Sequence, residues 1–109
     1  MSVTTIVPGD LVVQDPSDIR TYIFDWNQYN LAVGATIASS SFTITAISPA
    51  GDTAFVKDNE GTMSGNRKTT LRLSLGTLHA IYEVANKIVT NETPAQTKER
   101  SFRVLIEQQ

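Results

Sequence analysis

The stretch AIYEVANKIVTNETPAQTKERSFRVLI, residues 80–106, decides the fold of this chain. Tyr82, Val84, Asn86 and Ile88 alternate with the residues between them, and the same period of two returns from residue 102 to residue 106. A polar segment, residues 90–100, separates these two runs. A period of two is typical of strands, so two neighbouring runs joined by a polar loop predict an antiparallel strand pair.

The same alternation recurs through most of the chain. Residues 19–26 carry apolar side chains on both faces, which predicts a central strand, and further strands are predicted at residues 36–47, 53–57 and 69–75. A turn at residues 49–52 and a long polar loop at residues 57–68 separate them. Short strands with frequent turns favour a sandwich. We therefore predict an all-β fold, an immunoglobulin-like antiparallel β-sandwich of about seven strands over residues 19–109.

The first eighteen residues follow a different pattern, because Pro8, Gly9 and Pro16 interrupt their apolar positions. One interpretation is an edge strand at residues 11–13 behind a frayed tail. The other is an extended N-terminal arm that lies on a neighbouring subunit, since an unpaired apolar strand is a template for pairing with another chain. Residues 1–18 are thus expected to form an arm or an edge strand.

Composition narrows the class of protein. The length of 109 residues fits one domain, and the formal net charge of −2 is too weak to attract a phosphate backbone, so no nucleic-acid partner is expected. The absence of Cys excludes disulfides and thiolate metal sites. The first residues lack the basic start of a secretory signal, and no stretch reaches the roughly 20 apolar residues of a membrane span. We expect no membrane partner and synthesis in the cytoplasm of the cell that makes the protein.

Catalytic and metal-binding patterns are not recognisable in the sequence. His79 is the single histidine, and neither Ser74 nor Ser101 lies in a nucleophile-elbow motif that could join it in a triad. The run from Asp58 to Gly61 places its oxygen-bearing side chains consecutively, whereas calcium loops alternate them. The sequence therefore predicts no enzyme and no catalytic, metal or cofactor site, and leaves open whether the long loop binds a cation.

Three aromatic residues allow another class of function. Trp26 with Tyr22 and Tyr29 would supply the stacking platform of a carbohydrate-binding module. A tryptophan at the end of a strand more often covers the core, so burial of Trp26 is the observation that separates the two interpretations.

Four segments together resemble a known family of phage proteins. Residues 24–31, FDWNQYNL, and 34–44, GATIASSSFTI, resemble a strand ending in D-W, a short loop and G-D-T-I-A-x-S-x-W-x-V, with Ala35 and Phe42 in place of the acidic residue and the Trp. Residues 82–90, YEVANKIVT, and 99–106, ERSFRVLI, resemble the family's Y-x-V-x-N-x-I-x-T and closing E-R-S-F strands. The resemblance covers residues 19–106 and is to the fibre–tail adaptor proteins of tailed bacteriophages, which are immunoglobulin-like sandwiches.

The resemblance implies a multi-copy structural protein of the virion that joins tail or neck to fibres through protein–protein contacts. A capsid decoration protein is the alternative with the same fold, and a carbohydrate-binding module is the alternative from another class. The expected contact residues lie in the N-terminal segment and the long polar loop: Ile6, Val7, Leu11, Val13, Asp58, Glu60, Met63 and Arg67.

Overall fold

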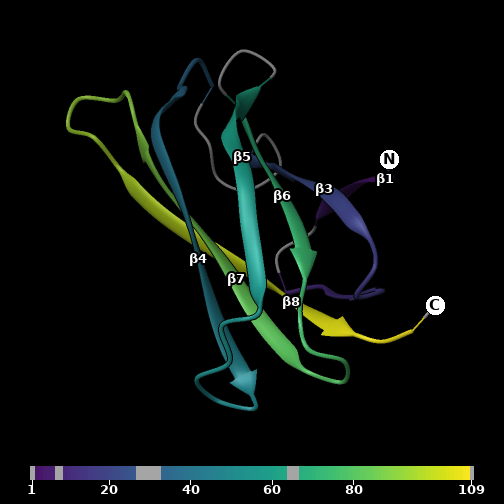
Figure 1. The fold of residues 1–109 in the computed structure, drawn as a ribbon. Helices are drawn as coiled ribbons and strands as arrows, with labels where there is room; N and C mark the ends of the chain where they lie inside the picture. The colour runs from purple at the N-terminus through teal and green to yellow at the C-terminus, as the bar shows by residue number, and fades with distance from the viewer. Residues whose placement is uncertain (1, 7–8, 27–32, 64–66, 109) are drawn as a thin grey trace.

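The computed structural model describes residues 2–6, 9–26, 33–63 and 67–108, and it folds as eight strands (Figure 1). These are β1 (Ser2–Ile6), β2 (Leu11–Gln14), β3 (Ile19–Asp25), β4 (Ile37–Ser48), β5 (Phe55–Met63), β6 (Lys68–Leu75), β7 (Ile81–Thr90) and β8 (Thr97–Ile106). They form two four-stranded sheets with the orders β1-β3-β6-β5 and β2-β8-β7-β4. The predicted all-β sandwich is confirmed.

The predicted pair at the end of the chain is β7 and β8, which run antiparallel with Ile81 opposite Leu105 and Val89 opposite Thr97. β3 lies between β1 and β6, so it is the interior strand that its two apolar faces predicted. Two pairings depart from the antiparallel expectation, because β1 runs parallel to β3 and β2 runs parallel to β8. The N-terminal segment crosses from one sheet to the other and adds one short strand to the edge of each.

This crossing corrects the frayed tail expected ahead of residue 11. Residues 2–6 pair with Arg20 to Phe24 along β3, and the side chain of Ile6 is 1% exposed within the core. The edge strand expected at residues 11–13 is present as β2, one residue longer. Residues 19–109 hold six strands, β3 to β8, where about seven were expected, and β1 and β2 add two before them.

The prediction of a long polar loop at residues 57–68 is wrong. β5 continues to Met63 and forms a hairpin with β6, although residues 57–62 are all polar or glycine. An edge strand whose residues 56–60 are all exposed tolerates such a sequence, because its ladder hydrogen bonds come from the backbone. The pairing shifts between Asp58 and Gly61, where Asn59 takes a positive φ of 52°. A bulge of this kind blunts an exposed edge.

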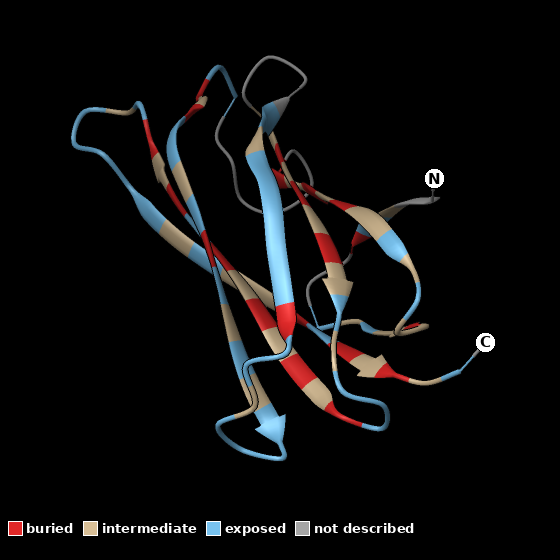
Figure 2. Ribbon diagram, in the orientation of Figure 1, coloured by how far each residue is buried: buried red, intermediate tan, exposed pale blue. Residues whose placement is uncertain are grey.

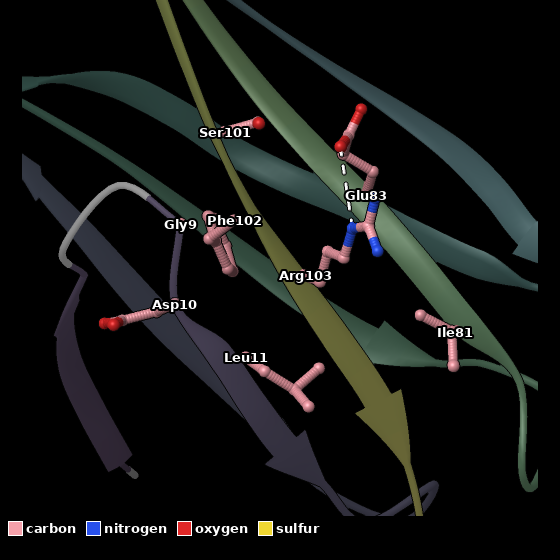
Figure 3. A pocket seen from close by; sticks show the side chains of 8 residues that line it. All are labelled: Gly9, Asp10, Leu11, Ile81, Glu83, Ser101, Phe102 and Arg103. Atoms are coloured by element: carbon pink, nitrogen blue, oxygen red, sulfur yellow. Dashed lines mark ion pairs between the residues drawn. The ribbon is translucent and has the colours of Figure 1, made fainter.

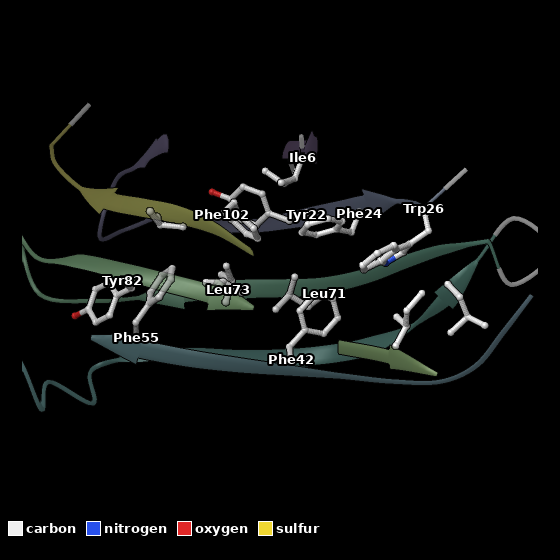
Figure 4. Packing of buried hydrophobic residues seen from close by; sticks show 14 of the residues in the cluster. Ile6, Tyr22, Phe24, Trp26, Phe42, Phe55, Leu71, Leu73, Tyr82 and Phe102 are labelled. Atoms are coloured by element: carbon white, nitrogen blue, oxygen red, sulfur yellow. The ribbon is translucent and has the colours of Figure 1, made fainter. Parts of the chain in front are cut away.

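Aromatic side chains fill the space between the sheets (Figure 4). Trp26 is 0% exposed and Phe42 is 4% exposed, which confirms that both occupy the core. Trp26 stacks on Phe24 with ring centroids 5.4 Å apart, and Phe102 from the other sheet packs against Tyr22 at 5.3 Å. Edge and offset contacts of this kind add to the burial of apolar area.

Asn86 on β7 is a buried polar side chain that joins the two sheets. Its Oδ1 accepts hydrogen bonds from Trp26 Nε1 at 2.8 Å and from Thr69 Oγ1 at 2.6 Å. Its Nδ2 donates to Ser40 Oγ at 2.9 Å and to the Ser41 carbonyl at 3.0 Å. The amide therefore satisfies its own polar atoms and the indole N–H, none of which reaches water.

Gln14 at the end of β2 is a second buried link between the sheets. Its Nε2 donates to the Leu73 carbonyl at 2.9 Å and to the Asp18 carbonyl at 3.2 Å. Its Oε1 accepts from the hydroxyl of Tyr22 at 2.8 Å. Burial raises the pKa of Tyr22 above its usual value, so this hydroxyl stays neutral and remains a donor across the physiological range.

We predict that Asn86→Ala lowers the free energy of unfolding by about 2–4 kcal/mol, because it removes several hydrogen bonds and leaves the Trp26 N–H buried without an acceptor. Urea unfolding would show a lower midpoint with an unchanged m value. Asn91→Ala is the matched control, since Asn91 is exposed and its Oδ1 accepts one bond, from the Thr36 N–H. Equal midpoint shifts for the two variants would contradict the role given to Asn86.

Candidate protein-binding surfaces

Polar clusters of the described residues make hydrogen bonds and ion pairs within the fold. His79 is exposed at the turn before β7, with its Nδ1 2.9 Å from Glu107 Oε2. No three His, Asp or Glu side chains within the described ranges gather as metal ligands. The same ranges contain no helical segment with the length and apolarity that a bilayer crossing requires. The functional question therefore turns to the surface.

The aromatic platform that a carbohydrate-binding module needs is not formed by the two residues of it that the structure describes. Trp26 is 0% exposed and Tyr22 is 1% exposed, so neither ring can stack on a sugar. Tyr29 lies outside the described residues. The burial of Trp26 favours the interpretation in which it covers the core.

Asp52, in the turn between β4 and β5, holds a corner of the sandwich. Its carboxylate accepts hydrogen bonds from Thr77 Oγ1 at 2.6 Å, from the Ala54 N–H at 2.8 Å and from the Tyr82 hydroxyl at 2.7 Å. These hydrogen bonds lower the pKa of Asp52 below its usual value of 3.8. The bond from Thr77 has the largest effect, followed by those from Ala54 and Tyr82. The acceptor for the Tyr82 hydroxyl is thus a carboxylate and not a backbone carbonyl.

The outward face of the β2-β8-β7-β4 sheet, here called the outer face, carries an apolar row at one end. Val13 on β2 lies opposite Leu105 on β8, which lies opposite Ile81 on β7. The row continues to β4, where the pairing shifts beside Ile81 and Ile47 is 38% exposed. Because cross-strand partners share a face, these side chains lie next to one another along the whole width of the sheet.

A row of charged and polar residues lies beside the apolar row. Arg103 on β8 is paired in register with Glu83 on β7, and its Nε lies 3.7 Å from Glu83 Oε2. Leu11 on β2, 59% exposed, lies opposite Arg103 on the other side. Figure 3 shows Leu11 and Ile81 on either side of β8, at the rim of an open hollow of about 500 Å³. The hollow is lined by Gly9, Asp10, Leu11, Ile81, Glu83, Ser101, Phe102 and Arg103.

The second surface is the edge strand β5. Residues 56–60 are all exposed, so most of this strand stands out as a polar ridge, pale blue in Figure 2, which we call the β5 ridge. Asp58 forms a bidentate ion pair with Arg72 of β6. Arg72 Nε donates to Asp58 Oδ1 at 2.8 Å, and Arg72 Nη2 donates to Asp58 Oδ2 at 2.7 Å. The hydrogen bond from Arg72 is the main cause that lowers the pKa of Asp58. Val56 adds an apolar side chain that is 42% exposed.

The expected contact residues fall into three groups. Leu11 and Val13 lie on the outer face, whereas Ile6 is buried in the core of its own chain and is not available at the surface. Asp58 and Glu60 lie on the β5 ridge, where Glu60 also binds Lys57 at 2.7 Å and the Phe42 N–H at 3.2 Å. The remaining three are Met63, which ends β5, Arg67, whose guanidinium donates to the Ala35 carbonyl, and Val7, which lies outside the described residues.

Sequence reasoning missed Ile47, Ile81, Glu83, Leu105 and Arg103 as surface residues. Each is an ordinary outward position of an alternating strand, so none stands out alone. The signal that reveals them is the register between strands, which brings the apolar members of three separate segments into one row.

Comparison with known protein families agrees with this fold. The sequence profile of the Gp77 family, described as podophage GP4 fiber-tail adaptor protein gp77, matches residues 14–105. This span runs from the last residue of β2 into β8 and covers most of the chain. The protein is therefore a phage structural protein of the adaptor class. It belongs to the Gp77 family of podophage fibre–tail adaptors, and no curated protein matches it.

We predict that the stability of the protein falls as the pH drops through the acid range, because a carboxylate with a lowered pKa stabilises the fold above its unfolded pKa and loses this effect as it is protonated. For Asp52 that loss starts near the usual value of 3.8 and grows below it. Asp52→Asn keeps the shape of the side chain, so its stability should fall less steeply between about pH 4 and pH 2.

Urea unfolding at a series of pH values measures this difference. Asp58→Asn, at the other carboxylate with a lowered pKa, should flatten the profile in the same direction. Identical slopes for the wild type and Asp52→Asn would show that the corner hydrogen bonds do not hold Asp52 ionised.

Proposed function

We propose that this chain is a non-enzymatic component of a tailed-phage virion that joins the fibres to the tail through protein–protein contacts. The observation that carries the proposal is the family match over residues 14–105, which spans the sandwich. The proposal places the chain in the assembled particle after synthesis in the cytoplasm of the bacterial host. It needs no cofactor, because binding alone performs the task.

An adaptor needs separate surfaces for separate partners, and two surfaces of different character support the proposal. The outer face offers an apolar row beside charged residues, whereas the β5 ridge is an exposed edge strand. The bulge between Asp58 and Gly61 limits the addition of a further strand along this edge, so its exposed side chains are the groups available to a partner. We assign the β5 ridge, with Asp58 and Glu60, to a tail, neck or fibre protein.

Several copies in one particle would make weak contacts sufficient. Linked binding sites raise the overall avidity by roughly 10²–10⁴ without any new contact, provided that the geometry allows simultaneous engagement. Strong single anchors are therefore not required on either surface.

We predict that phage particles assembled without this chain carry a tail and lack bound fibres, because the connection between them is missing. Electron microscopy of such particles, with and without the chain supplied from a plasmid, tests this. Antibody labelling of intact particles should place the chain at the tail. Label over the head with normal fibre attachment would instead support the decoration alternative.

A pair of substitutions tests the β5 ridge. Val56→Asp places an unpaired charge on the ridge and should lower the attachment of fibres to particles by about tenfold, because a charge buried in an interface without a partner is costly. Leu78→Asp is the matched control, since Leu78 in the turn before β7 is 40% exposed and Val56 is 42% exposed. If Val56→Asp and Leu78→Asp lowered fibre attachment equally, or if neither lowered it, the β5 ridge would not be a binding surface for the partner.

A further inference from the structure

The outer face has a regular pattern of charge along its two central strands, β7 and β8. Arg103 and Glu83 face each other across β8 and β7, and two rows farther along Glu99 and Lys87 face each other with the signs exchanged. Between these rows lie the small residues Ser101 and Ala85. Along each strand the charge therefore alternates, and the opposite strand carries the opposite sign at every charged row.

A surface with this pattern is complementary to itself. If a second copy faces it across a two-fold axis that runs along the strands between β7 and β8, each β7 lies over the partner's β8. Glu83 then meets the partner's Arg103, and Lys87 meets the partner's Glu99. The small central residues allow the two sheets to approach to the roughly 10 Å at which sheets pack.

The apolar row decides between two possible axes. An axis along the strands brings the row onto its own copy, with Leu105 over the partner's Ile81 and Val13 near the partner's Ile47. An axis across the strands also pairs opposite charges, but it would place the apolar row against the row of Ser39, Val89 and Thr97, in which Val89 is the single apolar residue. Burial of apolar area therefore favours the axis along the strands.

On the other sheet one row alone of the β3–β6 register joins opposite charges, Asp25 opposite Lys68 at 3.9 Å, and no second row with the signs exchanged accompanies it. On its outward face, the central strands β3 and β6 place Thr21 beside Arg72, and the charge that Arg72 binds is Asp58 on the edge strand β5. A two-fold axis between β3 and β6 would set Arg72 against Thr21, with no opposite charge at that row.

We propose that the outer face binds a second copy of this chain, in a symmetric pair with its two-fold axis along β7 and β8. Four strands about 4.8 Å apart and roughly nine residues long cover about 600 Å² of each copy, which is at the small end of specific interfaces. We therefore expect a dimer that dissociates at micromolar concentrations. The proposal rests on the adaptor function only for the expectation that several copies meet in one particle.

Charge reversals at the two central residues test the pair and its axis. Glu83→Arg sets two arginines against each other in the dimer, and Arg103→Glu sets two glutamates against each other. Because the contact occurs twice, each variant alone should dissociate about tenfold more readily than the wild type. A mixture of the two variants restores both contacts. The arginine introduced at position 83 of one copy faces the glutamate introduced at position 103 of the other. The unchanged Arg103 of the first copy faces the unchanged Glu83 of the second. A mixed dimer should therefore form with affinity close to that of the wild type.

The rescue separates contacts between copies from those within one chain, because the pair between residues 83 and 103 of the same chain is lost in both variants and stays lost on mixing. Sedimentation equilibrium of the purified full chain measures all three dissociation constants, and circular dichroism verifies that each variant is folded. Arg72→Glu, on the outward face of the other sheet, is the matched control and should leave dimerisation unchanged.

Three results would overturn the proposal: a wild-type chain that stays monomeric at millimolar concentration, single variants that dimerise as the wild type does, or a mixture that shows no rescue. A rescue of Glu83→Arg by Lys87→Glu instead would indicate the axis across the strands and also contradict the axis proposed. None of these results bears on fibre attachment, so the dimer and the adaptor function can fail separately.

Discussion

The side-chain amide of Asn86 fixes how the two sheets of this protein lie on each other. Apolar residues alone would allow the sheets to slide, because aliphatic and aromatic contacts are not directional. The amide is 0% exposed and has partners on β4, on β6 and at the end of β3, which belong to both sheets. Its hydrogen bonds form together in one relative position of the sheets, and any other position would leave buried polar atoms unsatisfied.

Gln14 provides the second point that such an alignment requires. Asn86 binds β6 at Thr69 and Gln14 binds it at Leu73, four residues farther, which is about 13 Å along the strand. Two directional ties at that separation resist both sliding and rotation of one sheet against the other. These hydrogen bonds and the aromatic core lie between the sheets. The outward faces therefore contribute little to the stability of the fold and are available for binding.

Alternation predicted what depends on local sequence: the β7–β8 pair, the interior position of β3, and the burial of Trp26 and Phe42. It failed for β5, where polar residues form an edge strand whose stability comes from backbone pairing with β6. It also failed for β1, because five residues before a proline are too few to show a period. The candidate surfaces were predicted in part. Leu11 drew attention as an apolar residue without a place in the core, whereas the row through Leu105 and Ile81 exists only through the register of strands distant in sequence.

The outer face and the β5 ridge belong to different sheets, so both can be engaged in one assembly. A symmetric pair formed through the outer face buries one sheet of each copy and leaves both β5 ridges exposed, because β5 belongs to the other sheet. Such a pair presents two β5 ridges to their binding partner. The avidity of two linked contacts exceeds the affinity of either contact alone. Since the charges of the outer face occur as neighbouring opposite pairs, this association is directed by register more than by net charge, which is only −2 for the chain. Under the two proposals, the sandwich connects other proteins through one face that binds a second copy and one edge strand that stays open to a partner.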